Sequence, residues 1–427
     1  MTPLPRILLG VFMAVAPLLA QDTEQEKEQA EKEPANKGVR SVWKKHPSFR
    51  AGDWLRVDFR ARFQLDWITR DPETKPGGGL FDFTRKRLAI EGTFLRWFEY
   101  EVSRELSETD FPWKDVYGNF KLNRSVQVRG GRFRIPFSQD QLTGPTNLDF
   151  IDRSRIADRL APNRDTGAMA HGSFFEGGAL KYQAGYFFND GDNAADRNNN
   201  RTGENTAALR LTGRPLSKSG LFGSLTLGGA FNRAGVPEGL VSLRGRTTGK
   251  ETFFSEVFVN GTRMRTGAEF SWTPGPFALK AEFISVREQR LGQGLRQEDL
   301  PDLLERGWYV YGTWAITGQN KARGLARGRG WLLGGKNRFG ALELAVRAES
   351  IRFASDTNAG RPSRTQRAAN ILQTSDRAWT FGVNWYANQW VKAQANFTRE
   401  YLEDAFRAPI QGVNLYWVYK YRLQLSL

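Results

Sequence analysis

The chain has 427 residues, with 62 Lys and Arg against 46 Asp and Glu, and its formal net charge is +16. It contains no cysteine, which excludes disulfide scaffolds, thiol nucleophiles and cysteine-ligated metal sites. A mean hydropathy of -0.54 is too polar for a bundle of membrane-spanning helices. Aromatic residues at 13% and 44 glycines suit either a large soluble β protein or an outer-membrane barrel. The basic excess is compatible with nucleic acid, anionic lipid or an anionic solute as the partner.

Residues 1–20 have the three-part layout of a secretory signal peptide. Arg6 precedes an apolar run at 7–16, and small Ala20 precedes the expected cleavage site. No later segment has the roughly 18 consecutive apolar residues that a transmembrane helix needs. We therefore expect an exported protein of the periplasm, the outer membrane or the medium.

Residues 21–53 are expected to form a charged periplasmic segment. The stretch 22–37 has no aromatic residue and no Ile, Leu or Val, so it lacks the apolar surface needed to order itself against a core. We expect it to act as a solvated tether.

From Trp54 onward, apolar and polar residues alternate. Between residues 55 and 67 every odd position is apolar and every even position is polar, which places the two kinds of side chain on opposite faces of a strand. Comparable stretches recur to the end of the chain, and we leave out 251–260, which would break the even count. The sixteen expected strands lie near 54–67, 82–94, 98–107, 114–122, 126–134, 164–174, 179–188, 204–213, 221–232, 263–273, 276–288, 305–317, 339–353, 377–387, 391–401 and 413–425.

Short and long connections alternate between these strands. The connection at 95–97 is short, for example, and the one at 135–163 is long. Transmembrane barrels have short periplasmic turns and long external loops, and they close with an even number of strands. We therefore predict an all-β fold, with residues 54–427 forming a transmembrane antiparallel β-barrel of about 16 strands around an aqueous lumen.

Several basic side chains fall on the polar, lumen-facing side of the first expected strands. A guanidinium group keeps its charge at any relevant pH and matches the oxygens of phosphate or carboxylate, so a row of them would attract anions. The Gly130-Gly131 pair is expected to bulge its strand, which leaves the direction of the two arginines after it open. These predicted pore-lining residues are Arg56, Arg60, Arg62, Arg85, Arg87, Lys121, Arg129, Arg132 and Arg134.

The segment GRFRIPFSQDQLTGPTNLDFIDRSRIADRLAPNRDTG, which contains the third long connection, resembles the phosphate-selective porin O and P family. The residues that carry the resemblance are Gly131, Phe133, Arg134, Pro136, Phe137, Asp152, Arg153, Ser154, Arg164, Asp165 and Gly167. The resemblance implies an outer-membrane, homotrimeric porin that passes anions such as phosphate or chloride through a constriction formed by an inward-folded third external loop. It adds Arg153, in that loop, to the predicted anion-binding residues.

Three alternatives remain beside an anion-selective porin. One is a general porin of low selectivity in the same membrane, and another is a secreted β protein that binds polyanions. The third is an enzyme, which we do not expect, because the 2 His residues have no nucleophile, metal-ligand pair or phosphate loop near them in sequence. We predict no catalytic residue, metal or cofactor, and no nucleic-acid partner; apart from the anions, the expected partners are outer-membrane lipid and further copies of the chain.

Overall fold

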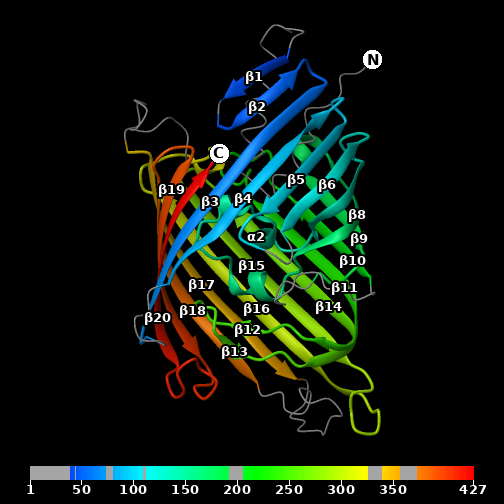
Figure 1. Cartoon of the computed structure of the whole chain (residues 1–427), viewed down its shortest axis with the longest axis vertical. Helices are drawn as coiled ribbons and strands as arrows, with labels where there is room; N and C mark the ends of the chain where they lie inside the picture. The colour runs from blue at the N-terminus through cyan, green and yellow to red at the C-terminus, as the bar shows by residue number, and fades with distance from the viewer. Residues whose placement is uncertain are drawn as a thin grey trace.

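A computed structural model describes residues 39–43, 45–73, 80–108, 112–191, 205–325, 339–355 and 373–427. The expected signal peptide and the stretch 22–37 lie outside these residues. Long antiparallel strands dominate the described chain (Figure 1). Among the described residues, no helix has the length and apolar character needed to cross a bilayer.

Sixteen of the described strands form one closed antiparallel barrel, as the alternation predicts. The ring closes where the last strand, β20, pairs with the first, β3, from Trp417↔Asp71 to Ser426↔Arg62. The barrel strands are β3 (Leu55–Asp71), β4 (Leu80–Phe94), β5 (Phe98–Glu105), β6 (Trp113–Lys121), β7 (Gln127–Arg134), β8 (Arg164–Phe174), β9 (Leu180–Phe187), β10 (Thr206–Gly213), β11 (Thr226–Val241), β14 (Phe258–Trp272), β15 (Phe277–Arg290), β16 (Leu300–Ala315), β17 (Ala341–Ser355), β18 (Thr374–Tyr386), β19 (Val391–Leu402) and β20 (Leu415–Ser426).

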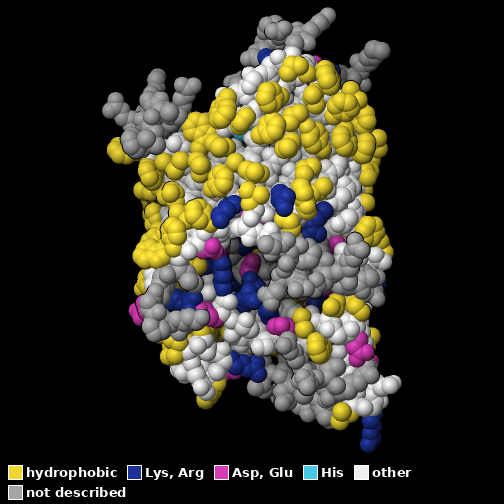
Figure 2. Space-filling model, in the orientation of Figure 1, with side chains coloured by type: hydrophobic (Ala, Val, Ile, Leu, Met, Phe, Trp, Pro, Cys, Tyr) yellow, Lys and Arg dark blue, Asp and Glu magenta, His cyan; other side chains and the backbone are white. Residues whose placement is uncertain are grey.

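The two faces of the barrel wall differ in polarity. On β18, Trp379 and Phe381 are exposed on the outer face, whereas Asp376, Thr380 and Asn384 are buried on the inner face. Apolar side chains cover much of the outer surface (Figure 2). A wall that is apolar outside and polar inside is the arrangement of a barrel in a lipid bilayer.

The expected strand near 221–232 is displaced in the structure. Its strand, β11, begins at Thr226 and continues to Val241, because residues 214–225 form the turn that precedes it. The region left out of the strand count, 251–260, divides into two parts. Residues Thr252–Phe254 (β13) pair only with Gly245–Arg246 (β12), and Phe258 already belongs to β14.

The short and long connections lie at opposite ends of the barrel, with two departures from regularity, of which the turn at 214–225 is the smaller. The connection between β16 and β17 lies at the end of the short turns, yet it spans 316–340 and carries the 3-10 helix η5 (Lys321–Arg323). Residues 326–338 of this connection lie outside the described chain. A second described 3-10 helix at this end, η4 (Glu176–Gly178), forms a tight turn between β8 and β9.

The charged segment before the barrel contains a β-hairpin that the sequence does not predict. Its strands are β1 (Val39–Trp43) and β2 (Pro47–Ala51), and β2 pairs with the start of β3, with Ser48 opposite Asp58. Figure 1 shows the hairpin beyond the barrel rim, at the end where the C-terminus also lies. The hairpin therefore extends one part of the barrel wall.

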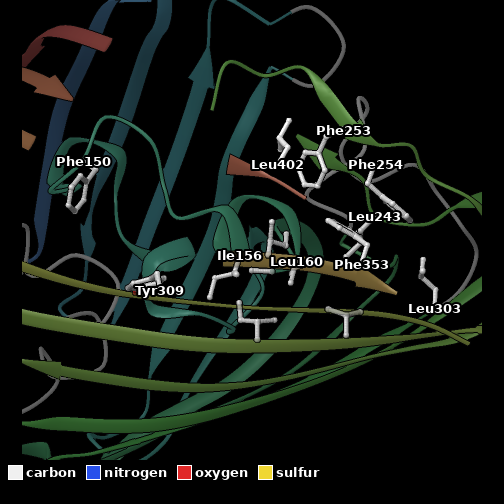
Figure 3. Packing of buried hydrophobic residues seen from close by; sticks show 14 of the residues in the cluster. Phe150, Ile156, Leu160, Leu243, Phe253, Phe254, Leu303, Tyr309, Phe353 and Leu402 are labelled. Atoms are coloured by element: carbon white, nitrogen blue, oxygen red, sulfur yellow. The ribbon is translucent and has the colours of Figure 1, made fainter. Parts of the chain in front are cut away.

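The largest hydrophobic cluster lies on the inner side of the wall. The third long connection carries three short helices, α2 (Gln139–Leu142), η3 (Pro145–Asn147) and α3 (Arg155–Arg159). Ile156 and Leu160 pack in this cluster with Phe253 of the β12–β13 hairpin and with Phe353 of the wall (Figure 3). Two external connections are thus anchored to one side of the barrel by apolar contacts.

Candidate pore lining

The predicted arginines of β3 and β4 all lie on the inner face. Arg56 pairs with Asp58 at 2.9 Å, and Arg60 pairs with Glu91 at 2.7 Å. Arg85 donates to Gln64 Oε1 at 2.6 Å, and Arg87 donates to Glu105 at 3.2 Å. Each of these four cations has a polar partner on its own wall, so their positive charge is partly compensated.

Arg62 differs from its neighbours. It makes no hydrogen bond or direct ion pair with any residue that the structure describes. The carboxylates that interact with it electrostatically belong to Glu101, which accepts a hydrogen bond from Tyr117, to Glu91, which is paired with Arg60, and to Asp115. Across the β3–β4 pair, Arg62 stands directly opposite Arg87. Like charges placed opposite each other on neighbouring strands repel, and of the two only Arg87 has a described ion pair, with Glu105.

Lys121 and Arg129 continue the basic wall on β6 and β7. Lys121 forms an ion pair with Glu99, and the Arg129 guanidinium lies 4.2 Å from the centre of the Tyr117 ring. Both face the interior, because their strand neighbours two positions away are buried on that side.

Arg132 and Arg134, which follow the glycine pair, have different surroundings. Gly131 has φ +126°, and a Cβ there would meet the Val116 carbonyl oxygen at 2.3 Å, so the close pairing of β6 and β7 requires glycine. Arg132 donates through Nε to the backbone carbonyl of Trp113, whose side chain is exposed on the outer face. Arg134 instead reaches the third long connection, as described below.

The turn after α2 is held by two arginines. Arg134 Nη1 donates to the carbonyls of Leu142 and Thr143, each at 2.9 Å. Arg153 Nη2 donates to the same Thr143 carbonyl at 2.6 Å, and its Nε donates to the carbonyl of Asp140 at 3.1 Å. Both side chains therefore fix the path of the connection in addition to placing positive charge beside it.

The start of α2 is bound by a carboxylate of the opposite wall. Glu282 of β15 accepts hydrogen bonds from Gln139 N at 2.7 Å, Asp140 N at 3.1 Å and Ser138 Oγ at 3.1 Å. The first amides of a helix have no partner within the helix, so this carboxylate satisfies them. Tyr309 donates to the same carboxylate at 2.8 Å.

Arg155, at the start of α3, engages three further carboxylates of that wall. Its Nη1 lies 2.6 Å from Asp376 and 2.9 Å from Glu400, and its backbone amide donates to Glu349 at 2.8 Å. These acids belong to β17, β18 and β19 and are almost fully buried. The connection thus covers the acidic part of the barrel wall with its own donors.

Asp149, further along the connection, is surrounded by lysines. Lys321 of η5 lies 2.8 Å from it and Lys280 of β15 lies 3.6 Å from it, while the Tyr311 hydroxyl donates to it at 2.9 Å. Lys321 also binds Glu343. Burial alone would raise the pKa of Asp149, but the two ammonium groups outweigh it and hold that pKa below its usual range.

Sequence reasoning did not select several cations that lie in this connection or contact it. They are Arg155, Lys280, Lys321, Lys392, Lys420 and Arg422. Lys420 pairs with Asp152, and Arg422 donates to the Ile151 carbonyl at 2.7 Å. Both stand on the polar side of the last predicted strand, so the alternation could have identified them, whereas nothing in the sequence indicates the role of Lys321.

The only histidine on a barrel strand has a structural role. His171 of β8 is buried, and its Nε2 lies 2.7 Å from Asn119 Oδ1 of strand β6. In the described part of the chain, no group of three or more His, Asp or Glu side chains is arranged to hold a metal ion.

A closed barrel with an apolar outer face and a charged interior defines an outer-membrane β-barrel protein. The chain belongs to the phosphate-selective porin O and P family, whose sequence profile matches residues 57–407. The protein therefore resides in the outer membrane of a Gram-negative bacterium, and it is a channel protein rather than an enzyme.

Comparison with individual proteins agrees with this assignment. Porin O of Pseudomonas aeruginosa is 26% identical over 136 residues, which are 31% of this chain and 28% of that protein's length. OmpT of Vibrio cholerae has a similar structure, with a TM-score of 0.57 at 11% identity over 88% of this chain and 99% of that one. An anion-selective porin from Comamonas acidovorans has a TM-score of 0.54 at 10% identity over 87% of this chain and 100% of that one. At such identities the structural matches establish the fold alone.

Proposed function

We propose that the protein forms a water-filled, anion-selective channel for the passive diffusion of small anions, with phosphate or polyphosphate among its substrates. The path runs along the arginine wall of β3 and β4. The third external connection, 135–163, folds inward and forms the constriction on the other side of this path.

The observation that carries this proposal is the separation of charge inside the barrel. Carboxylates of β15 to β19, including Glu282, Glu349, Asp376 and Glu400, are buried and accept hydrogen bonds from the connection. An acid that is already bound to donors attracts a passing cation less than a free one. Figure 2 shows Lys and Arg side chains gathered around a hollow in the middle of one face, with fewer Asp and Glu side chains there. The acids of β15 to β19 are therefore already bound to donors, whereas Asp58, Glu91 and Glu105 compensate part of the charge of the arginine wall itself.

Three of the predicted residues are assigned the direct contact with anions. The Arg62 guanidinium makes no hydrogen bond or direct ion pair with a described residue, and the side chains of Arg60 and Arg85 remain 13% and 20% exposed beside it. Several guanidinium groups on one wall can pass an oxyanion from one to the next. Arg134 and Arg153 contribute chiefly by holding the connection in place.

The comparisons support the anion as substrate. The family name refers to phosphate selectivity, and a fold neighbour is described as an anion-selective porin. The competing function is that of a general porin of low selectivity, which has the same type of barrel.

A blocking experiment on single channels in a planar bilayer tests the proposal. Phosphate added to a chloride solution should reduce the chloride current of the native protein, and Arg62→Gln should weaken this block by roughly tenfold, as expected for a lost charge-assisted contact. Arg104→Gln is the matched control, since Arg104 is exposed on the outer face against the Trp113 ring. A native channel that phosphate does not block would favour the general porin.

We also propose that the protein is a homotrimer. A trimer form of Vibrio cholerae OmpT has a TM-score of 0.54 at 11% identity over 88% of this chain and 100% of that one. Native mass spectrometry of the detergent-solubilised protein tests this, with a monomer as the contrary result.

A further inference from the structure

Three arginines of neighbouring strands point outward from the barrel wall. Arg306 of β16, Arg352 of β17 and Arg377 of β18 are all exposed, and none makes a hydrogen bond or ion pair with a described residue. Arg306 stands directly opposite Arg352 in the strand register, and Arg377 stands opposite Ser350 on the same strand as Arg352. Like charges placed across neighbouring strands repel, so the cluster is destabilising unless an anion compensates it.

The three guanidinium groups lie at the head of a groove in the outer wall. The groove has a volume of about 430 Å³, and all three arginines line it. Its sides are the indoles of Trp308 and Trp379, which are 44% and 55% exposed. Strand β17 runs between the two indoles, with Ser350 opposite Trp308 and Ala348 opposite Trp379. The small side chains of β17 therefore form the floor of the groove.

The position of the groove along the strands matches the boundary of a membrane. The outward residues of β18 run from Arg377 and Trp379 through Phe381 and Val383 to Trp385. Indoles mark the level of the lipid headgroups at both ends of such an apolar band. The arginines stand beyond the first indole, at the end of the barrel that carries the long external connections.

We propose that this groove binds a phosphorylated acyl lipid of the outer leaflet. Its phosphate groups contact Arg306, Arg352 and Arg377, and one acyl chain lies on β17 between Trp308 and Trp379. A guanidinium offers paired donors that match phosphate oxygens, and basic pockets at the headgroup level are typical lipid-binding features. Among the described residues that line the groove, Glu403 is the one carboxylate besides the inward-facing Glu349, and it does not offset three positive charges.

Lipid binding to the full-length, delipidated protein in a neutral detergent tests the proposal. The probe is bisphosphorylated lipid A, and the readout is native mass spectrometry of the complex at increasing lipid concentration. The combined variant Arg306→Gln, Arg352→Gln and Arg377→Gln should bind this lipid at least roughly tenfold more weakly than the native protein. The dephosphorylated lipid should bind the native protein equally weakly, and inorganic phosphate alone should not displace the bound lipid.

Two further variants show whether lipid binding depends on the charge of the three arginines or on the shape of the groove. Arg287→Gln is the matched control, because Arg287 also faces outward but already pairs with Asp302 on the neighbouring strand. Ser350→Trp keeps all three charges and fills the floor of the groove, so it should weaken lipid binding as well. Ion selectivity should be the same in every variant, since all these side chains face away from the lumen.

Equal binding of phosphorylated lipid A to the native protein and the triple-glutamine variant would overturn the proposal. Loss of oligomers with unchanged lipid binding would also overturn it, because the patch would then bind a second copy of the chain. Neither result bears on the proposed anion channel, which the bilayer currents test separately.

Discussion

Arg134 and Arg153 donate to one and the same acceptor, the carbonyl oxygen of Thr143, at 2.9 Å and 2.6 Å. Arg134 ends strand β7 and Arg153 lies beyond the turn, so the two side chains hold the turn between the wall and the rest of the connection. Arg134 and Arg153, which the sequence predicts to be anion ligands, therefore fix the position of the third long connection.

Removing one of these arginines should widen the pore. Charge-assisted hydrogen bonds contribute about 1.5–3 kcal/mol each, and Arg153→Met removes the two that Arg153 makes to backbone carbonyls. We expect a larger single-channel conductance and more current noise in this variant. Arg132→Met is the control, because among the described residues the hydrogen-bond acceptor of Arg132 is the Trp113 carbonyl near the outer face. A smaller conductance in Arg153→Met would contradict a holding role.

Arg155→Met should shift selectivity toward cations. The change leaves Asp376 and Glu400 buried without the guanidinium that they share, and breaking such a buried pair costs about 3–5 kcal/mol. We expect a lower thermal stability of the barrel and a reversal potential closer to that of potassium. Adding Asp376→Asn and Glu400→Gln should restore both properties, and failure of this rescue would show that Arg155 acts in another way.

Lys321→Met should weaken the attachment of the third long connection, 135–163, to the end of the barrel that carries the short turns. Lys321 is the cation closest to Asp149, and it also binds Glu343 and Thr313. We expect frequent brief changes of single-channel current, because Asp149 then keeps only Lys280 and Tyr311 as described partners beside it. Lys218→Met, which removes an exposed lysine in a turn at the same end, should leave the current steady.

The pore should remain steady in mild acid and become unsteady only at low pH. Burial raises the pKa of Asp149 and Asp152, but the lysines around them outweigh it and hold both values below the ordinary range. An Asp in the unfolded chain has a pKa of about 3.9, and the folded pKa values of these two residues are lower. Their ion pairs are therefore fully formed above about pH 5 and are lost as the pH falls through the folded pKa values. Current noise should therefore be constant from about pH 8 to pH 5 and rise below about pH 3. Asp149→Asn should show the noise already at neutral pH.

The barrel could be predicted from the sequence because lipid on one side and water on the other impose a two-residue period. That period is visible from Leu55 to Trp67, and its recurrence along the chain predicts the number of strands and the closure of the barrel. It also predicts that Arg60, Arg62 and Arg85 lie on the inner face. The paired glycines before Arg132 and Arg134 also signalled that the direction of these two side chains could not be read from alternation.

The contacts of the third connection could not be predicted in the same way. Arg155 meets Asp376 and Glu400, which lie more than 200 residues away, and Lys321 approaches Asp149 from the opposite end of the barrel. No local pattern records such pairings, because they join segments that are far apart in the sequence. The β1–β2 hairpin was missed because its two strands are only five residues each and lack a sustained alternation.

The reversal potential of the native protein under a KCl gradient is the decisive measurement of its ion selectivity. With the acids of β15 to β19 bound by the connection and the arginines of β3 and β4 facing the path, the potential should have the sign of a chloride-selective pore. A potential of the sign set by potassium would contradict the account.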